Sequence, residues 1–70
     1  MIVFSKLWET MKTQEMTTYK LIKKYGVSPA QITRLKRNNN INTHTINRLC
    51  EILNCNVSDI MEYIPDEKTK

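Results

Sequence analysis

The sequence predicts a single all-α domain built from five short helices. At 70 residues, with 40% hydrophobic residues, the chain has enough apolar side chains for one small core. A capping residue followed by helically spaced apolar residues recurs along it, and its one glycine and two prolines argue against a turn-rich β architecture. We expect one domain over residues 1–70, with its core in about residues 5–64 and a polar tail over residues 65–70.

The chain begins with an apolar triplet, residues 2–4, that is too short to form a helix. This triplet either anchors the N-terminus in the core or forms a small strand that pairs with residues 62–64. A first helix should follow, opened by Ser5, because Leu7, Trp8 and Met11 recur at helical spacing.

Two further helices are expected on either side of a tight turn at Gly26. Thr17 can cap the first of them, because its side-chain oxygen can accept a hydrogen bond from a backbone N–H of the first turn. Gly26 should end this helix, since glycine readily takes the left-handed conformation that follows a helix C-terminus. Ser28 can cap the next helix, with Pro29 at its first position and Gln31 completing a capping box.

The C-terminal half is predicted to hold the fourth and fifth helices, capped by Asn42 and Asn56. The apolar positions of the fourth helix recur at i, i+3, i+4 and i+7, at Ile46, Leu49, Cys50 and Leu53. The fifth helix should carry Ile60, Met61 and Ile64 and end at Pro65.

Charge is distributed unevenly along the chain. Residues 1–40 carry eight Lys or Arg against two Glu, a net charge of +6, whereas residues 41–70 carry three against five, a net charge of −2. Every formally charged side chain between Glu15 and Glu51 is basic. An ordinary solvated surface mixes both signs, so a one-signed half suggests a polyanionic partner. Chance or solubility is the alternative explanation of this pattern.

Two consecutive helices joined by a tight turn match the helix-turn-helix, whose second helix enters the major groove of DNA. In the expected helix 29–37, Ile32 and Leu35 should face the core. Small and cationic side chains then lie on or near the opposite side: Pro29, Ala30, Thr33, Arg34 and Arg37. Small residues at the start of the helix allow close approach to base edges, and the cations behind them can reach bases or phosphates. This segment is therefore predicted to face DNA.

The stretch TTYKLIKKYGVSPAQITRLKRN resembles the helix-turn-helix of Cro/C1-type (XRE, lambda-repressor-like) transcriptional regulators. The matching positions are Thr17, Leu21, Gly26, Val27, Ser28, Ile32, Thr33, Leu35 and Arg37. Further on, TINRLCEILNCNVSDIM is similar to the fourth and fifth helices of that family. The resemblance covers residues 6–64 and is strongest to short, stand-alone regulators of bacteria and their mobile elements. It implies a five-helix lambda-repressor-like fold in which helices 2 and 3 form the helix-turn-helix.

The resemblance also implies which residues contact DNA bases. Base-reading positions of the family correspond to Ser28, Pro29, Ala30, Thr33 and Arg34. Pro29 and Ala30 can offer only apolar contact, for instance to a thymine methyl, so hydrogen-bond readout would depend on Gln31, Thr33 and Arg34. Gln31 is instead fully used if it completes the capping box. Arg34 is instead a solvated helix residue if it does not contact guanine.

Contacts to the DNA backbone are implied at both ends of the helix-turn-helix and in the loop that follows it. The corresponding residues are Thr17, Thr18, Lys36, Arg37, Asn38, Asn39, Asn40, Thr43 and His44. Thr18 is shorter than the Gln that is common at its position, and Lys36 and Asn38 stand where the family usually has Glu and Gly. Asn38, Asn39 and Asn40 alternatively serve only as a left-handed helix stop and loop.

Other classes of function have little support in the sequence. His44, Cys50 and Cys55 are only three potential ligands and no Cys-x-x-Cys pair is present, so neither a metal site nor a cofactor is expected. Without a phosphate-cradling glycine loop or paired carboxylates around a cleft, we expect no enzyme and no small-molecule substrate. The N-terminus has no secretory signal and no apolar run could span a membrane, which favours a cytoplasmic protein with free thiols and no membrane partner.

The leading prediction is a sequence-specific, double-stranded-DNA-binding transcriptional regulator, most simply a repressor, that places the helix 29–37 in the major groove. An antitoxin-like or other protein-interaction module on the same fold, and a non-specific nucleic-acid or RNA binder, are the alternatives. A single helix-turn-helix buries limited DNA surface, so a homodimer is expected. Its predicted interface is the acidic, apolar C-terminal part: Ile60, Met61, Tyr63 and Ile64.

Overall fold

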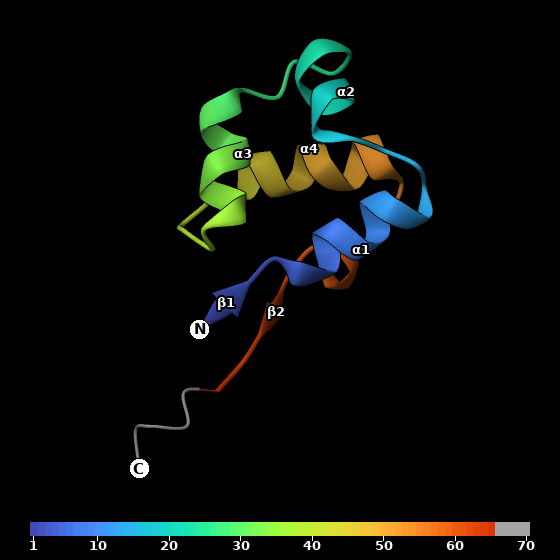
Figure 1. The fold of residues 1–70 in the computed structure, drawn as a ribbon. Helices are drawn as coiled ribbons and strands as arrows, with labels where there is room; N and C mark the ends of the chain where they lie inside the picture. Colours follow the sequence, from blue (N-terminus) through green and yellow to red (C-terminus); the bar gives the residue numbers. More distant parts are fainter. Residues whose placement is uncertain (66–70) are drawn as a thin grey trace.

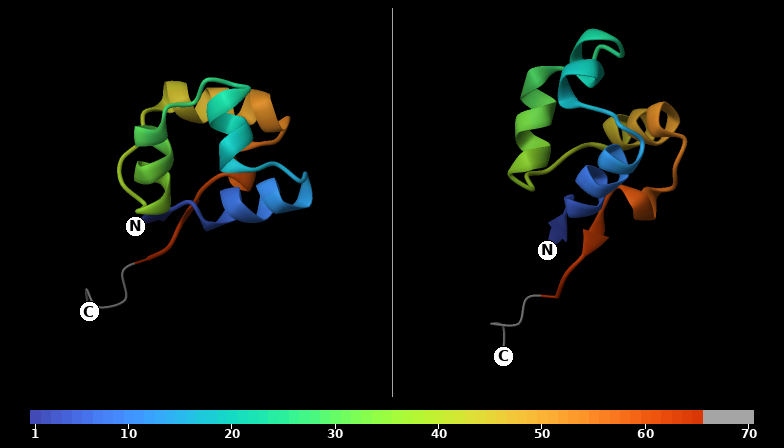
Figure 2. Two further views of the ribbon diagram at one scale, coloured as in Figure 1. Left: turned by 45° about the horizontal axis from the view of Figure 1, so that its top comes forward. Right: turned by 45° about the vertical axis from the view of Figure 1, so that its right-hand side comes forward.

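The computed structural model describes residues 1–65 as four α-helices, one turn of 3-10 helix and a two-stranded antiparallel sheet (Figure 1). The elements follow the order β1 (Ile2–Val3), α1 (Ser5–Thr13), α2 (Thr18–Lys23), α3 (Pro29–Lys36), α4 (Thr43–Leu53), η1 (Val57–Asp59) and β2 (Glu62–Tyr63). α2 and α3 lie on one side of α4, and α1 lies near the small sheet that joins the two ends of the chain (Figures 1 and 2). Most of the predicted polar tail lies outside the described residues.

Three of the predicted helix caps are confirmed. The side chains of Thr17, Ser28 and Asn42 each accept a hydrogen bond from the backbone N–H three residues further on, at 2.9–3.2 Å. Pro29 occupies the first turn of α3, as expected, where the missing N–H of proline costs no helical hydrogen bond. α1 differs, since Phe4 is its N-cap and no side chain caps it. The starts of α2, α3 and α4 are therefore determined by local sequence.

The predicted fifth helix is wrong. Only Val57–Asp59 form a helical turn, which opens as Asn56 donates its backbone N–H to the Asp59 carboxylate at 3.1 Å. The next residues extend into β2, and the backbone N–H of Ile64 donates to the carbonyl of Met1 at 2.8 Å. Burial declines from Ile60 through Met61 to the exposed Ile64, so these side chains do not share one buried helical face. Pairing with β1 supplies the hydrogen bonds that a last helical turn would have made.

Both readings of the N-terminal triplet hold. Ile2 pairs with Tyr63 and Val3 with Glu62, which confirms the small strand. Phe4 is buried in the core, which confirms the anchor. Its backbone N–H donates to the side-chain oxygen of Asn38 at 2.9 Å, so the start of α1 is tied to the end of α3.

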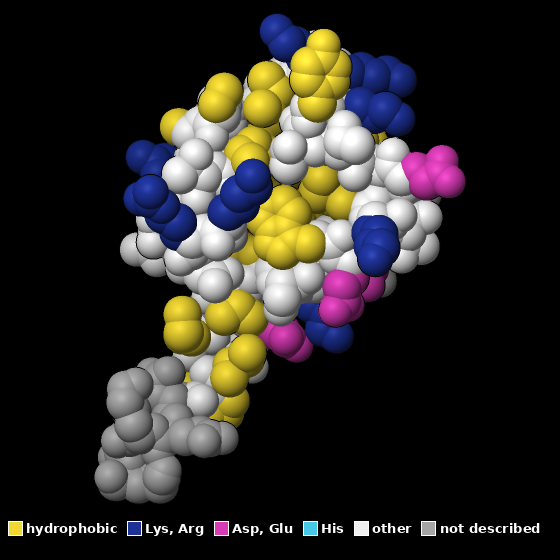
Figure 3. Space-filling model, viewed as in Figure 1, with side chains coloured by type: hydrophobic (Ala, Val, Ile, Leu, Met, Phe, Trp, Pro, Cys, Tyr) yellow, Lys and Arg dark blue, Asp and Glu magenta, His cyan; other side chains and the backbone are white. Residues whose placement is uncertain are grey.

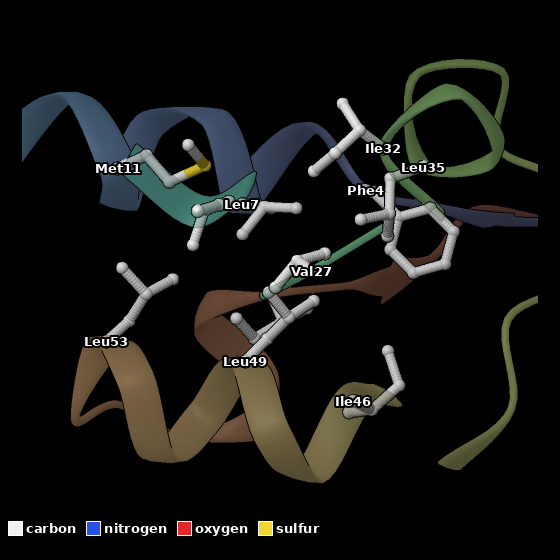
Figure 4. Packing of buried hydrophobic residues seen from close by; sticks show 11 residues of the cluster. Phe4, Leu7, Met11, Val27, Ile32, Leu35, Ile46, Leu49 and Leu53 are labelled. Carbon is white, nitrogen blue, oxygen red and sulfur yellow. The ribbon is translucent and has the colours of Figure 1, made fainter. Parts of the chain in front are cut away.

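The core is one apolar cluster to which every α-helix contributes (Figure 4). Its buried members are Phe4, Leu7, Met11, Leu21, Val27, Ile32, Leu35, Ile46, Leu49, Leu53 and Ile60. α4 is central, and its side chains Ile46, Leu49 and Leu53 point toward those of α1 and of the segment that contains Val27 (Figure 4). Long-range hydrogen bonds support this packing, including Gln14 to the Leu53 carbonyl at 2.7 Å. No helix within residues 1–65 is long and apolar enough to cross a membrane.

Candidate nucleic-acid interface

The turn between α2 and α3 is fixed by backbone geometry and by one side chain from α4. Gly26 has a φ of +74°, in the left-handed region that glycine adopts at little cost, as the sequence predicts. The next residue, Val27, is buried, and its backbone N–H donates to the carbonyl of Leu21 at 2.9 Å. The Arg48 guanidinium on α4 donates a hydrogen bond to the backbone carbonyl of Tyr25, so α4 helps to hold the turn in place. The orientation of α3 relative to α2 therefore depends on α4 as well as on the turn.

α3 presents two different faces, as expected. Ile32 and Leu35 are buried against the core, and this fixes the rotation of the helix about its own axis. The residues predicted to read bases on the other side are exposed: Ser28, Pro29, Ala30, Thr33 and Arg34. The Thr33 hydroxyl donates to the Pro29 carbonyl at 3.2 Å, which leaves its oxygen available as an acceptor. Arg34 is the long cation among these predicted base-reading residues.

Gln31 differs from the other predicted base-reading residues because its side chain is half-buried. Its backbone N–H donates to the Ser28 hydroxyl, but its side-chain oxygen is buried without a hydrogen-bond partner among residues 1–65, so the predicted capping box of Gln31 with Ser28 does not form. It lines a hollow of about 200 Å³ between the turn and α4, together with Gly26, Val27, Ser28, His44, Thr45, Arg48 and Leu49. Its oxygen is therefore directed away from solvent, and a base-reading role for this residue stays a prediction.

The predicted backbone-contacting residues flank α3. Lys36, Arg37, Asn39, Asn40, Thr43 and His44 are exposed, Thr17 is an exposed cap, and Thr18 is half-buried. Asn38 has a φ of +57° and its side-chain oxygen accepts from Phe4, so it serves as a left-handed helix stop. That structural role was the alternative reading of Asn38, and it leaves the amide N–H₂ group available to donate.

Cationic side chains gather over the part of the surface formed by α2 and α3 (Figure 3). In the view of Figure 3, most of the visible Lys and Arg lie at the left and top of the molecule, whereas most of the visible Asp and Glu lie at the lower right. Lys20, Lys23, Lys24, Arg34, Lys36 and Arg37 are all exposed. The uneven charge of the sequence therefore becomes a cationic surface around the outward face of α3, with the sign that attracts a phosphate backbone.

Comparison with known proteins identifies this arrangement. The model of the Cro/C1-type helix-turn-helix DNA-binding domain matches residues 6–66. The chain belongs to this family. Its fold is similar to the crystal structure of the transcriptional regulator VanUg, with a TM-score of 0.84 and 31% sequence identity over 93% of this chain and 87% of that chain. No match was found among curated proteins.

The predicted dimer surface of this Cro/C1-type domain needs one correction. Ile60 is completely buried and packs in the core, so it offers no surface to a partner and its assignment was wrong. Met61 is half-buried, while Tyr63 and Ile64 are exposed on or next to β2. Met1 and Ile2 are also exposed and apolar, and the pairing of β1 with β2 brings them beside Tyr63 and Ile64.

The two cysteines are free thiols on and just after α4. Burial raises the pKa of the Cys55 thiol, and the neighbouring Cys50 and Asp59 raise it further. Among residues 1–65 no group of three or more His, Cys, Asp or Glu side chains is placed to hold a metal ion.

Proposed function

We propose that this protein is a sequence-specific transcriptional repressor that binds double-stranded DNA as a homodimer, with α3 in the major groove. The observation that carries the proposal is the outward face of α3, which is exposed and cationic while Ile32 and Leu35 anchor the opposite face. A helix held in this way can enter the groove without disturbing the core. Repression follows from occupancy, because DNA covered by the protein is closed to other proteins.

In the proposed complex, affinity and specificity come from different residues. Arg34 donates two hydrogen bonds to one guanine, while Pro29 and Ala30 make apolar contacts with thymine methyl groups. Lys36, Arg37 and the donors of the 39–44 segment contact phosphates and release bound counterions, so affinity falls steeply with salt. Binding alone accounts for this function, with no catalytic step, cofactor, metal or small-molecule substrate.

Selection of bound duplexes from a random DNA library tests the proposal directly. We expect enrichment of a short palindromic site whose half-sites lie about one helical turn, ~34 Å, apart. The Arg34→Ala variant should then lose about 1–3 kcal/mol of binding free energy for that site, and much less for a scrambled duplex. Lys23→Ala is the matched control, since Lys23 is an exposed cation on α2 and should weaken binding to both duplexes alike.

Each outcome has a separate meaning. Equal losses of binding free energy on both duplexes for Arg34→Ala would show that Arg34 contacts the DNA backbone and not the bases. A selection that enriches no sequence would contradict the proposal. Steep salt dependence would then indicate non-specific nucleic-acid binding, and shallow salt dependence would indicate a protein partner of the antitoxin type.

A further inference from the structure

We infer that Cys50 and Cys55 form a redox-active dithiol site at the end of α4, which a low-molecular-weight disulfide such as oxidised glutathione converts into an intramolecular disulfide. α4 ends on the side of the molecule away from α3 (Figures 1 and 2). The inference therefore goes beyond the proposed function and does not depend on it.

The backbone at the end of α4 brings the two cysteines together. Asn54 has a φ of +51°, and a left-handed residue at this place turns the chain back over the last turn of the helix. The backbone N–H of Cys55 then donates to the carbonyl of Cys50 at 3.1 Å. Bond lengths along this path keep the two Cα atoms less than about 7 Å apart. Beyond about 7 Å no disulfide forms without movement of the backbone, so the pair lies within reach of a bridge.

The side chains of the pair are also neighbours. At helix ends of this type, the side chains at these two positions commonly touch. The Cys50 side chain acts on the Cys55 thiol both through its charge and as a hydrogen-bond partner. Both cysteines are half-buried, and they line one hollow of about 450 Å³ together with Thr43, Ile46 and the exposed Val57. A small reagent can therefore reach both thiols from the same side.

The oxidation proceeds in two exchange steps. Cys50 loses its proton to solvent, and its thiolate attacks one sulfur of the small disulfide. The S–S bond of that disulfide breaks, and one small thiolate leaves and takes up a proton. Cys55 then loses its proton and attacks the Cys50 sulfur of the mixed disulfide, which releases the second small thiolate. The protein loses two electrons and two protons, and the small disulfide is reduced to two thiols.

The environment of Cys55 suits it to the second step. Burial raises the pKa of the Cys55 thiol, and the neighbouring Cys50 and Asp59 raise it further, so Cys55 is a poor first nucleophile. Once Cys50 is bonded to another sulfur, its negative charge no longer contributes to this shift. Cys55 is then held beside the sulfur that it attacks, which gives it a high effective concentration. In a reducing compartment the bridge is transient, as is typical of redox-sensing disulfides.

Equilibration of the full wild-type chain with mixtures of reduced and oxidised glutathione tests the inference. The intact mass after an acid quench should show a chain lighter by two hydrogen atoms, with no retained glutathione and no covalent link between chains. The effective concentration of the two thiols, calculated from this equilibrium, should be at least about tenfold higher in the folded chain than in urea. Unfolding removes the helix end that holds the thiols together.

Two single-cysteine variants test the order of the steps. Cys55→Ser should keep one glutathione on Cys50, because no second thiol is present to displace it. Cys50→Ser should acquire its glutathione several-fold more slowly than Cys55→Ser does, since a raised pKa lowers the thiolate fraction of Cys55. Equal rates would overturn the assignment of Cys50 as the attacking thiol.

Three results with the wild-type chain would overturn the site itself. They are a product that keeps one or two glutathione groups, a product linked only between chains, and an effective concentration no higher in the folded chain than in urea. These measurements need no variant to fold. Selection of bound DNA measures the proposed function separately, so either the regulator or the dithiol site can fail without the other.

Discussion

Substituting Gly26 by alanine measures the strain free energy of a left-handed backbone at the turn of the helix-turn-helix, separately from any side-chain contact. Gly26 has a φ of +74°, and no heavy atom lies within 4 Å of the position that a Cβ would occupy. Steric clash with neighbours is thereby excluded, and only the strain of a left-handed L-residue remains, about 1–2 kcal/mol. Alanine also lowers the conformational entropy of the unfolded chain, and this stabilising effect offsets about 0.4–1 kcal/mol of the strain. The net loss of unfolding free energy should be about 1 kcal/mol, or a Tm lower by roughly 4–8 °C for a domain of this size.

Urea denaturation of the wild type and of Gly26→Ala provides the assay, with operator binding of the folded variant measured in parallel. Affinity should be retained, because the turn keeps its shape and only its energy changes. Glu15→Gly is the reciprocal control: Glu15 is an exposed non-glycine residue with a φ of +57°, so glycine should stabilise the fold there. A loss of unfolding free energy above about 3 kcal/mol for Gly26→Ala would mean that the added methyl group clashes with neighbouring atoms, and would refute the reasoning.

Two further predictions concern side chains near α4. Gln31→Met should raise the unfolding free energy by about 1 kcal/mol in urea denaturation, because it removes a buried carbonyl oxygen that has no partner among residues 1–65. Operator affinity should be unchanged, and a clear loss would show that Gln31 reads a base. Alkylation of Cys55 in a Cys50→Ser chain at mildly alkaline pH should be slower in the folded protein than in urea, because burial raises the pKa of its thiol and so lowers the thiolate fraction. Equal rates in the two states would refute this pKa shift.

Local signals account for the parts of the fold that the sequence predicts correctly. Thr17, Ser28 and Asn42 each bind a backbone N–H only three residues away, and the left-handed turn at Gly26 needs no distant partner. The inward face of α3 was predictable for the same reason, since the spacing of Ile32 and Leu35 along one short helix fixes which side is buried. The outward surface of α3 can therefore be predicted from the sequence alone.

The features that the sequence did not determine depend on residues far apart in the chain. The apolar residues after Asn56 fit the start of a helix, but the N-terminal strand competes for their hydrogen bonds and this pairing joins residues about 60 positions apart. The bond from Arg48 to the Tyr25 carbonyl is likewise invisible to local patterns. The left-handed conformation of Glu15 carries no signal either, because no glycine or asparagine marks it.

One hydrogen bond connects the small sheet with the helix predicted to face DNA. Asn38 ends α3 and its side-chain oxygen accepts from the backbone N–H of Phe4, which directly follows β1 and is buried in the core. The last turn of α3 is therefore fixed relative to β1 and β2. A homodimer that used the predicted surface around Tyr63 and Ile64 would hold its two copies of α3 at one set distance and angle. The half-site spacing of the operator would follow from that contact, so residues of β2 would help to select the sequence that is bound.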